Sequence, residues 1–195
     1  MSWIVEHWPK STIFLAVYVT ILLFLFVFNE NIYLFLIWIQ VPIYWLHEFE
    51  EYILPGGFPE YFNENVLKSR QGEWPLSKKH SFWINIPIIY IAFPVSAILA
   101  GIIDISIGIW VAYFSILNAL FHVRLRITQG YNPGFYISAI LNIPIGLFTV
   151  IYFYINDAIT IRSHIIGLII AIILQGGLMV WGLKVLRGKV QQQQN

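Results

Sequence analysis

Residues 46–52 read Leu-His-Glu-Phe-Glu-Glu-Tyr, and they close a long apolar run. Charged side chains at membrane depth are costly and usually mark a functional site. On a helix, His47, Glu50 and Glu51 stand at positions i, i+3 and i+4 and share one face. Glu48 points about a quarter-turn away from that face. The stretch therefore predicts a helix whose last turns carry a converging metal or proton site, with the rest of the chain as its scaffold.

The composition indicates a membrane protein. The 195 residues are 58% hydrophobic and 11% charged, whereas about a quarter of the residues in soluble domains are charged. The mean hydropathy is +0.73. A formal net charge of +1 predicts no nucleic-acid partner. Without Cys, the chain has neither disulfides nor thiolate metal sites, so any metal must be held by His, carboxylate, amide or water.

Six apolar runs approach the length of a membrane span. A hydrocarbon core of about 30 Å needs about 20 residues in helical form. Backbone groups in lipid must be satisfied internally, so helices are the expected structure. We predict an all-α polytopic membrane bundle in a single domain, residues 1–190, with a polar tail at 191–195. The six predicted transmembrane helices are about 11–28, 31–53, 82–102, 104–127, 134–155 and 162–186.

Turn residues indicate where helices begin. We expect Asp104 to be the N-cap of the fourth helix, and Asn132-Pro133 to supply the N-cap and first residue of the fifth. Within the polar loop 56–80, Pro59 is expected to open a short interfacial helix. The side chains that we expect to face lipid there are Phe58, Tyr61, Phe62 and Leu67.

The basic residues predict the orientation. With six spans, one side of the membrane receives only Arg162. The other side collects the remaining ten, Lys10, Lys68, Arg70, Lys78, Lys79, Arg124, Arg126, Lys184, Arg187 and Lys189. Because Lys and Arg gather in cytoplasmic loops, we predict a multi-pass protein of a cell membrane with both termini cytoplasmic. Membrane lipids are the expected partners, and the sequence leaves open whether the chain forms a homo-oligomer.

A second polar pair closes the fourth predicted helix. Asn118 and His122 stand at i and i+4, on one face. His47 follows Asn31 by 16 residues, and His122 follows Asp104 by 18. At 1.5 Å per residue, the two imidazoles lie roughly 24 Å and roughly 27 Å from the outer ends of their helices. We therefore expect both at the same depth, near the cytoplasmic edge of the hydrocarbon.

The two patterns together resemble a known family. His47 to Glu51 read H-x-x-E-E, and Asn118 to His122 read N-x-x-x-H. The chain is similar to the HXXEE-domain family of small integral membrane proteins, which is named for the first motif and carries the second. The resemblance implies a membrane protein whose motif residues form a shared site. It brings no settled activity, so it does not decide the chemistry.

Two imidazoles with carboxylates suit a catalytic divalent metal, with zinc the first expectation. The predicted metal ligands are His47, Glu50, Glu51 and His122. Glu51 would act as general base, or exchange roles with Glu50, and Asn118 would orient a ligand or stabilise an oxyanion. We predict a metal-dependent hydrolase that cleaves an amide or ester bond in a lipid-like or amphipathic substrate at the cytoplasmic leaflet.

Other functions fit the same residues. Intramembrane His and Glu also form proton relays or cation sites, and Pro87, Pro94 and Pro144 are candidate helix breaks of a transporter. A di-iron redox site would need more carboxylates than the spans supply. Haem with His47 and His122 as axial ligands would leave the acids without a role. In the simplest alternative, the acids sit at an interfacial helix end and reach out to water.

A structural or partner-binding membrane protein is the remaining class. Gly167 and Ala171 form a small-xxx-small pair that permits close helix contact. Asn85 and Asn142 are expected to be interhelical hydrogen bonders. His80 is expected among the lipid headgroups, although it is near enough to the predicted site to be a further ligand. The sequence does not decide the roles of these three residues.

Overall fold

The structure is a computed structural model that describes residues 2–194. Within that range the chain is helical and contains no strand. Six helices are long and apolar enough to cross a membrane, which confirms the predicted all-α, six-span architecture. They are Trp3–Phe26, Ile32–Tyr52, Lys78–Ile102, Ile105–Gln129, Phe135–Ile155 and Ile161–Gln193. The first begins earlier, and the last ends later, than the hydropathy predicted.

The spans consist of helical segments joined end to end. The first contains α1 (Ser2–His7), η1 (Trp8–Ser11) and α2 (Thr12–Phe26), and the second α3 (Ile32–Trp38) and α4 (Gln40–Tyr52). The third contains α6 (Lys78–Asn85), η3 (Ile86–Ala92) and α7 (Phe93–Ile102), and the fourth η4 (Ile105–Gly108) and α8 (Ile109–Gln129). The fifth contains α9 (Phe135–Ile137), η5 (Ser138–Asn142) and α10 (Ile143–Ile155), and the sixth α11 (Ile161–Val180), η6 (Trp181–Leu186) and α12 (Arg187–Gln194). The segments α5 (Phe58–Tyr61) and η2 (Phe62–Val66) lie between the second and third spans.

Four of these segments, η2, η3, η5 and η6, are π-helical. Proline lacks an amide donor, and its ring collides with the carbonyl four residues earlier. That carbonyl lies in η3 for Pro94 and in η5 for Pro144, so a widened turn accommodates each ring. Single π-turns inside α-helices are frequent at functional sites.

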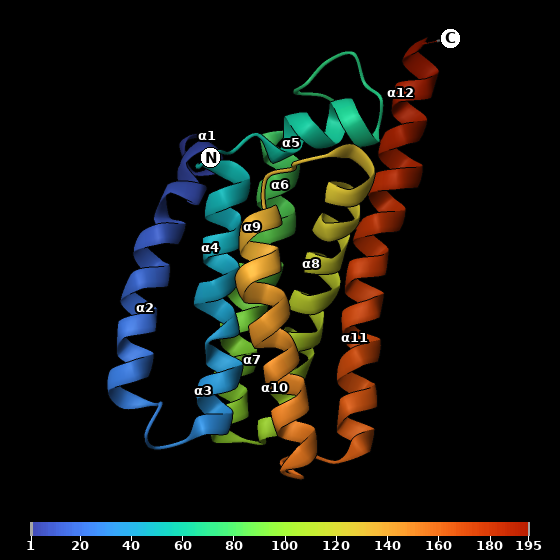
Figure 1. The fold of residues 1–195 in the computed structure, drawn as a ribbon. Helices are drawn as coiled ribbons and strands as arrows, with labels where there is room; N and C mark the ends of the chain where they lie inside the picture. The colour runs from blue at the N-terminus through green and yellow to red at the C-terminus, as the bar shows by residue number, and fades with distance from the viewer. Residues whose placement is uncertain (1, 195) are drawn as a thin grey trace.

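The second and fourth spans form the centre of the bundle. They are 67% and 50% buried inside the protein, whereas the other four are 22–28% buried. The segment α2 packs against α4, and α10 and α11 pack against α8. In Figure 1, α2 and α11 form opposite edges of the bundle. The apolar outer faces of these peripheral helices are the surface that a lipid bilayer would cover.

Aromatic rings fix the spacing of the central helices. The ring centroid of Phe93 on α7 lies 5.2 Å from that of Tyr44 on α4. It lies 5.3 Å from that of Trp110 and 5.6 Å from that of Phe114, both on α8. The interplanar angles are 76–90°, in the edge-to-face range that aromatic pairs prefer. The Phe93 ring thus packs against both helices that carry His47 and His122.

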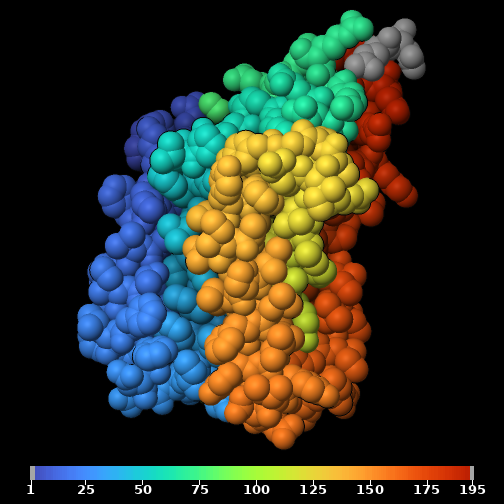
Figure 2. Space-filling view, viewed as in Figure 1, coloured from blue at the N-terminus to red at the C-terminus, as the bar shows by residue number. Residues whose placement is uncertain are grey.

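The expectation that the α5–η2 segment faces lipid is wrong. Phe62 and Leu67 are buried, and they pack with Leu76, Leu186 and Val190 from other parts of the chain. The segment lies across one end of the bundle (Figure 1), and its teal and green atoms cover that end in the space-filling view of Figure 2. The apolar face that suggested a membrane surface instead covers the ends of the spans.

The helix starts were predicted with mixed success. The Asp104 carboxylate accepts a hydrogen bond from the Ser106 amide at 2.8 Å, which confirms the cap of the fourth span. The cap predicted at Asn132-Pro133 is wrong, since the fifth span begins at Phe135 after Gly134. Asn132 does not cap that helix because its amide bonds to the fourth span instead.

Both ends of the described chain lie at the same end of the bundle. The segments α1 and α12 flank the α5–η2 segment there (Figure 1). An even number of spans requires this arrangement. Which side of the membrane this end faces stays a prediction from the distribution of Lys and Arg. The stretch predicted as a polar tail continues α12 as far as Gln194.

Candidate metal centre

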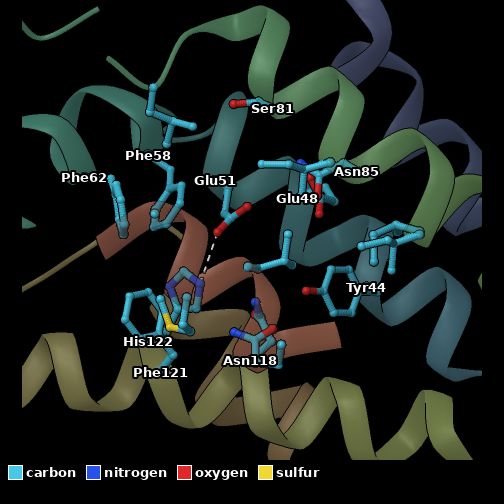
Figure 3. A pocket seen from close by; sticks show the side chains of 18 of the residues that line it. Tyr44, Glu48, Glu51, Phe58, Phe62, Ser81, Asn85, Asn118, Phe121 and His122 are labelled. Carbon is cyan, nitrogen blue, oxygen red and sulfur yellow. Dashed lines mark ion pairs between the residues drawn. The ribbon is translucent and has the colours of Figure 1, made fainter. Parts of the chain in front are cut away.

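Three side chains from two spans meet inside the covered end of the bundle. Glu51 Oε1 lies 3.4 Å from His47 Nε2 and 3.1 Å from His122 Nε2 (Figure 3 draws the latter contact). The two imidazole centroids are 4.7 Å apart, with the rings at 84°. All three residues are buried. The two histidines, expected at equal depth, lie side by side, and the three side chains form a group that could hold a metal ion.

The remaining nitrogen of His122 fixes its orientation. Asn132 Nδ2 donates to the backbone carbonyl of His122 at 3.0 Å, so Asn132 Oδ1 faces the ring, 2.7 Å from Nδ1. Because an amide oxygen only accepts, Nδ1 carries the proton and Nε2 offers its lone pair to the cluster. A hydrogen bond to the other nitrogen is how metal-binding histidines are usually held.

The Nδ1 atom of His47 also has a side-chain partner, a hydroxyl that can donate or accept. This Nδ1 atom lies 3.2 Å from the Ser138 hydroxyl on η5, and the Nε2 atom of His47 faces Glu51. Among residues 3–193, neither Nε2 atom of the two histidines has a hydrogen-bond partner. Both Nε2 atoms therefore point at one place, close to the same Glu51 oxygen.

Gly134 closes the cluster from the loop before the fifth span. It has φ +93°, a conformation that glycine tolerates and other residues rarely adopt. A Cβ atom built there would lie 2.8 Å from His122 Cε1 and 2.9 Å from both Glu51 Cγ and His47 Cε1. Only a residue without a side chain lets the backbone approach all three candidate ligands.

The structure does not bring Glu50 into this cluster. Its carboxylate accepts hydrogen bonds from the Tyr136 amide at 3.0 Å and the Ile137 amide at 2.7 Å. Backbone amides at a helix start lack partners within the helix and favour a negative charge. One residue further along α4 turns a side chain by about 100°, so Glu50 and Glu51 reach different neighbours. Glu50 anchors the fifth span rather than completing the ligand set.

Tyr131 adds a third contact to Glu50. Its hydroxyl donates to Glu50 Oε1 at 3.2 Å. Burial, and then the neighbouring Glu50 carboxylate, raise the pKa of the Tyr131 phenol above its usual range. The phenol therefore keeps its proton at neutral pH and stays a donor.

A cavity of about 100 Å³ opens beside the cluster. Glu51 and His122 form part of its wall, and Asn118 lies one turn before His122 on the same wall (Figure 3). Phe58 and Phe62 cover it from the α5–η2 segment, and the Phe58 ring lies 5.3 Å from that of His122. The cluster thus faces a small cavity with apolar and polar sides.

Glu48 lines the cavity, a position that the sequence did not predict. It was predicted to point away from the site, and it does leave the His47 face, but it enters the cavity instead of water. Only 1% of its surface is exposed. Its neighbours His47, Glu50 and Glu51 are also buried, so the alternative of acids reaching out to water at a helix end is wrong.

The polar residues left undecided take separate places. The His80 ring bonds with its own helix cap, Ser77, lies 5.6 Å from the Trp181 ring, and is not among the three side chains of the cluster. Asn85 lines the cavity and donates to the Tyr52 hydroxyl at 3.0 Å. Asn142 is buried and has no side-chain hydrogen bond within the described chain.

Six apolar helices and a buried His/Glu group fit a membrane metal-binding protein. The profile of one family matches residues 38–149, more than half of the chain. The chain belongs to this family, described as "Protein of unknown function with HXXEE motif". The matched region contains both sequence motifs and also Asn132, Gly134 and Ser138. Comparison with curated proteins and with solved structures gave no match.

Proposed function

We propose that the protein is a metal-dependent hydrolase of the membrane, with zinc at His47, Glu51 and His122. The observation that carries this proposal is the convergence of two Nε2 atoms and one carboxylate oxygen in a buried place beside a cavity. Two histidines and one acid, with a further position open, form a common ligand set of catalytic zinc. The likeness is one of ligand chemistry alone.

The spacing of the ligand atoms supports the proposal. Two ligand atoms each about 2.1 Å from a tetrahedral zinc lie about 3.4 Å apart. The two Nε2–Oε1 distances are 3.4 Å and 3.1 Å, and the three candidate atoms lie within 4.8 Å of one another. Small side-chain movements would bring them to bonding distance. Zinc held in this way supplies a hydroxide nucleophile at neutral pH.

The other residues have roles that follow from their positions. Glu51 meets both imidazoles through Oε1, which leaves Oε2 to take a proton from the attacking water and return it to the leaving group. Asn118 lies on the cavity wall, where its amide would donate to the oxyanion that develops at the attacked carbonyl. The hydroxyl of water would join the acyl carbon, and the proton would go to the departing nitrogen or oxygen of the amide or ester.

Elemental analysis of the purified full-length protein tests the metal site. We expect about one zinc per chain, lost in both His47→Ala and His122→Ala. His80→Ala is the matched control and should keep its zinc, since His80 lies outside the cluster. A wild-type protein that is purified without chelator, stays folded with added zinc and still binds none would overturn the proposal.

The hydrolytic step needs its own test. Zinc-loaded protein in bilayer discs should release free fatty acid from a mixture of acyl amides and esters of lipids. Glu51→Gln and Asn118→Ala should reduce this release, and Asn118→Ala should keep its zinc. Full zinc occupancy without hydrolysis of any amide or ester would limit the protein to metal binding.

Proton or cation transport is the second candidate. One observation favours it: buried polar side chains continue from the cluster toward the opposite end of the bundle. Gln40, two turns before His47, donates to Thr149 at 3.0 Å, and Asn142 lies one turn beyond Ser138. Proteoliposomes with an internal pH-sensitive dye would detect flux. Flux that disappears in His47→Ala, without any hydrolysis, would favour transport.

A further inference from the structure

The Glu48 carboxylate is buried without a partner. Neither of its oxygens has a hydrogen bond to any of the described side chains or backbone groups. Burying an ionised carboxylate alone is very unfavourable, and leaving even neutral polar atoms unpaired is costly. Glu50, two residues further on, has three donors for the same chemical group. Glu50, whose role is structural, thus receives hydrogen-bond donors from the protein, whereas Glu48 on the same helix does not.

The neighbours of Glu48 do not supply what it lacks. Asn85 lines the same cavity, but its amide donates to the Tyr52 hydroxyl. Gln175 on α11 also lines the cavity, is 8% exposed, and has an Oε1 without a partner in residues 3–193. Two side chains of the cavity wall thus present acceptor atoms without hydrogen-bond donors among the described residues.

Among residues 3–193, acidic side chains, but no Lys or Arg, line the cavity. The acids are Glu48 and Glu51. A metal in the cluster would be held by Glu51, so Glu48 is the acid of the wall that has neither a place in the metal group nor a hydrogen-bond donor among the described residues. A phosphate or carboxylate head group would meet repulsion on this wall, whereas a positively charged donor would satisfy both oxygens of Glu48.

An apolar part of the wall comes from the third and sixth spans. Ile84 and Ile88 lie on the third span, and Leu178, Met179 and Trp181 lie on the sixth. One water needs roughly 10–15 Å³ of cavity space, so about 100 Å³ accommodates a small head group. An attached alkyl chain would find apolar contacts along these two spans.

We propose that the cavity binds an amphipath with an ammonium head group, which pairs with Glu48 while its alkyl chain lies between the third and sixth spans. The ammonium supplies the hydrogen-bond donors that the Glu48 carboxylate lacks. That this amphipath is the substrate rests on the proposed function, because the cavity places it beside Glu51 and His122. The ammonium site itself rests on Glu48 and the wall around it.

Quenching of tryptophan fluorescence by brominated alkyl chains tests the proposal. Full-length protein in neutral detergent is titrated with three probes of one chain length, an alkylammonium, the alcohol and the carboxylate. We expect the ammonium probe to bind at least tenfold more tightly than the alcohol, and the carboxylate most weakly. Trp181→Phe should reduce the quenching amplitude, because Trp181 lines the cavity among eight tryptophans.

The variant Glu48→Gln should bring the affinity for ammonium down to that for the alcohol. Glu30→Gln is the matched control, because Glu30 is exposed and its replacement changes net charge equally. If Glu48→Gln does not fold, the head-group series on the wild type still decides. Equal binding of the three probes, or tightest binding of the carboxylate, would overturn the ammonium site.

Metal content of the same samples separates this inference from the proposed function. Glu48→Gln should keep its zinc. If it loses zinc, or if the wild type holds a second ion that this variant lacks, Glu48 is a metal ligand and the ammonium site is wrong. Ammonium preference in a protein without zinc would keep the ammonium site and refute the hydrolase. Zinc and hydrolysis without ammonium preference would do the reverse.

Discussion

The candidate metal centre has two sides that differ in whether their buried polar groups have hydrogen-bond partners. On the side of the fifth span, Asn132, Ser138 and Glu50 all have hydrogen-bond partners, and Gly134 packs directly on the cluster. On the cavity side, Glu48 has acceptor atoms with no partner within the described chain. A buried acid with a purely structural role can receive all its hydrogen-bond donors from the protein, as Glu50 does. The contrast indicates that the first side orients the ligands and the second side receives a bound molecule.

Gly134→Ala should have the largest effect on the orienting side. The added methyl would collide with all three candidate ligands at a backbone angle unfavourable for alanine. We expect loss of zinc and a decrease of about 2–6 kcal/mol in the free energy of unfolding. Elemental analysis and thermal unfolding would measure both.

Gly130→Ala separates collision from backbone strain. Gly130 also has a positive φ, of +90°, but a Cβ there would meet nothing within 4 Å. This variant should lose only about 1–3 kcal/mol and keep its zinc. Equal zinc content in both variants would refute the role of Gly134 in closing the cluster.

Asn132→Ala should weaken zinc binding by about 10–100-fold, because Nδ1 of His122 loses the acceptor that fixes its tautomer. Ser138→Ala should have a smaller effect, since its contact with His47 is longer, at 3.2 Å. Competition with a fluorescent chelator measures both affinities. Asn156→Ala removes a similar amide-to-carbonyl bond away from the site, and serves as the control. Unchanged zinc affinity in Asn132→Ala would contradict the orienting role.

Glu50→Gln should leave zinc binding intact and lower stability by about 1 kcal/mol, because a charge at the start of a helix is lost. Glu51→Gln, its direct neighbour, should abolish zinc binding. The pair would be measured by elemental analysis and thermal unfolding. Loss of zinc in Glu50→Gln would return Glu50 to the ligand set, as the sequence first suggested.

The smallest effect concerns Tyr131. Its pKa is raised in the folded state, so the folded protein holds this proton more tightly than the unfolded chain does. The stabilisation is therefore complete below about pH 10 and is lost as the pH rises toward the folded-state pKa. The thermal midpoint should fall less steeply above pH 10 in Tyr131→Phe than in the wild type. Tyr18→Phe, at an exposed position, is the control. Identical pH profiles of Tyr131→Phe and Tyr18→Phe would refute the contribution of Tyr131.

The sequence was sufficient for the spans and for the equal depth of the two histidines, but it did not show that the second and fourth spans are neighbours. Counting residues from Asn31 and Asp104 gave the depth of each imidazole, because helices rise regularly. It was not sufficient to choose between Glu50 and Glu51. They lie at i+3 and i+4 from His47, one on either side of its direction, and the choice depends on where the amides of the fifth span lie.

The orienting residues were also hidden in the sequence. Asn132-Pro133 has the pattern of a helix cap, and the same amide can bond to a distant carbonyl when the loop folds back. The apolar face around Phe58 and Phe62 gave a similar ambiguity. A lipid surface and the end of a helical bundle bury such a face equally well, so only the packing of the whole chain decides.

The candidate metal ligands and part of the cavity wall lie on different kinds of helix. The ligands His47, Glu51 and His122 lie on α4 and α8, which are regular α-helices, whereas the cavity receives Phe62, Ile88 and Trp181 from three π-turns. A π-turn holds one residue more than an α-turn, so deleting one residue would rotate the helix beyond it by about 100°. Single-residue insertions or deletions in these π-turns can therefore change the shape of the cavity without moving the α-helical residues that carry the three candidate metal ligands.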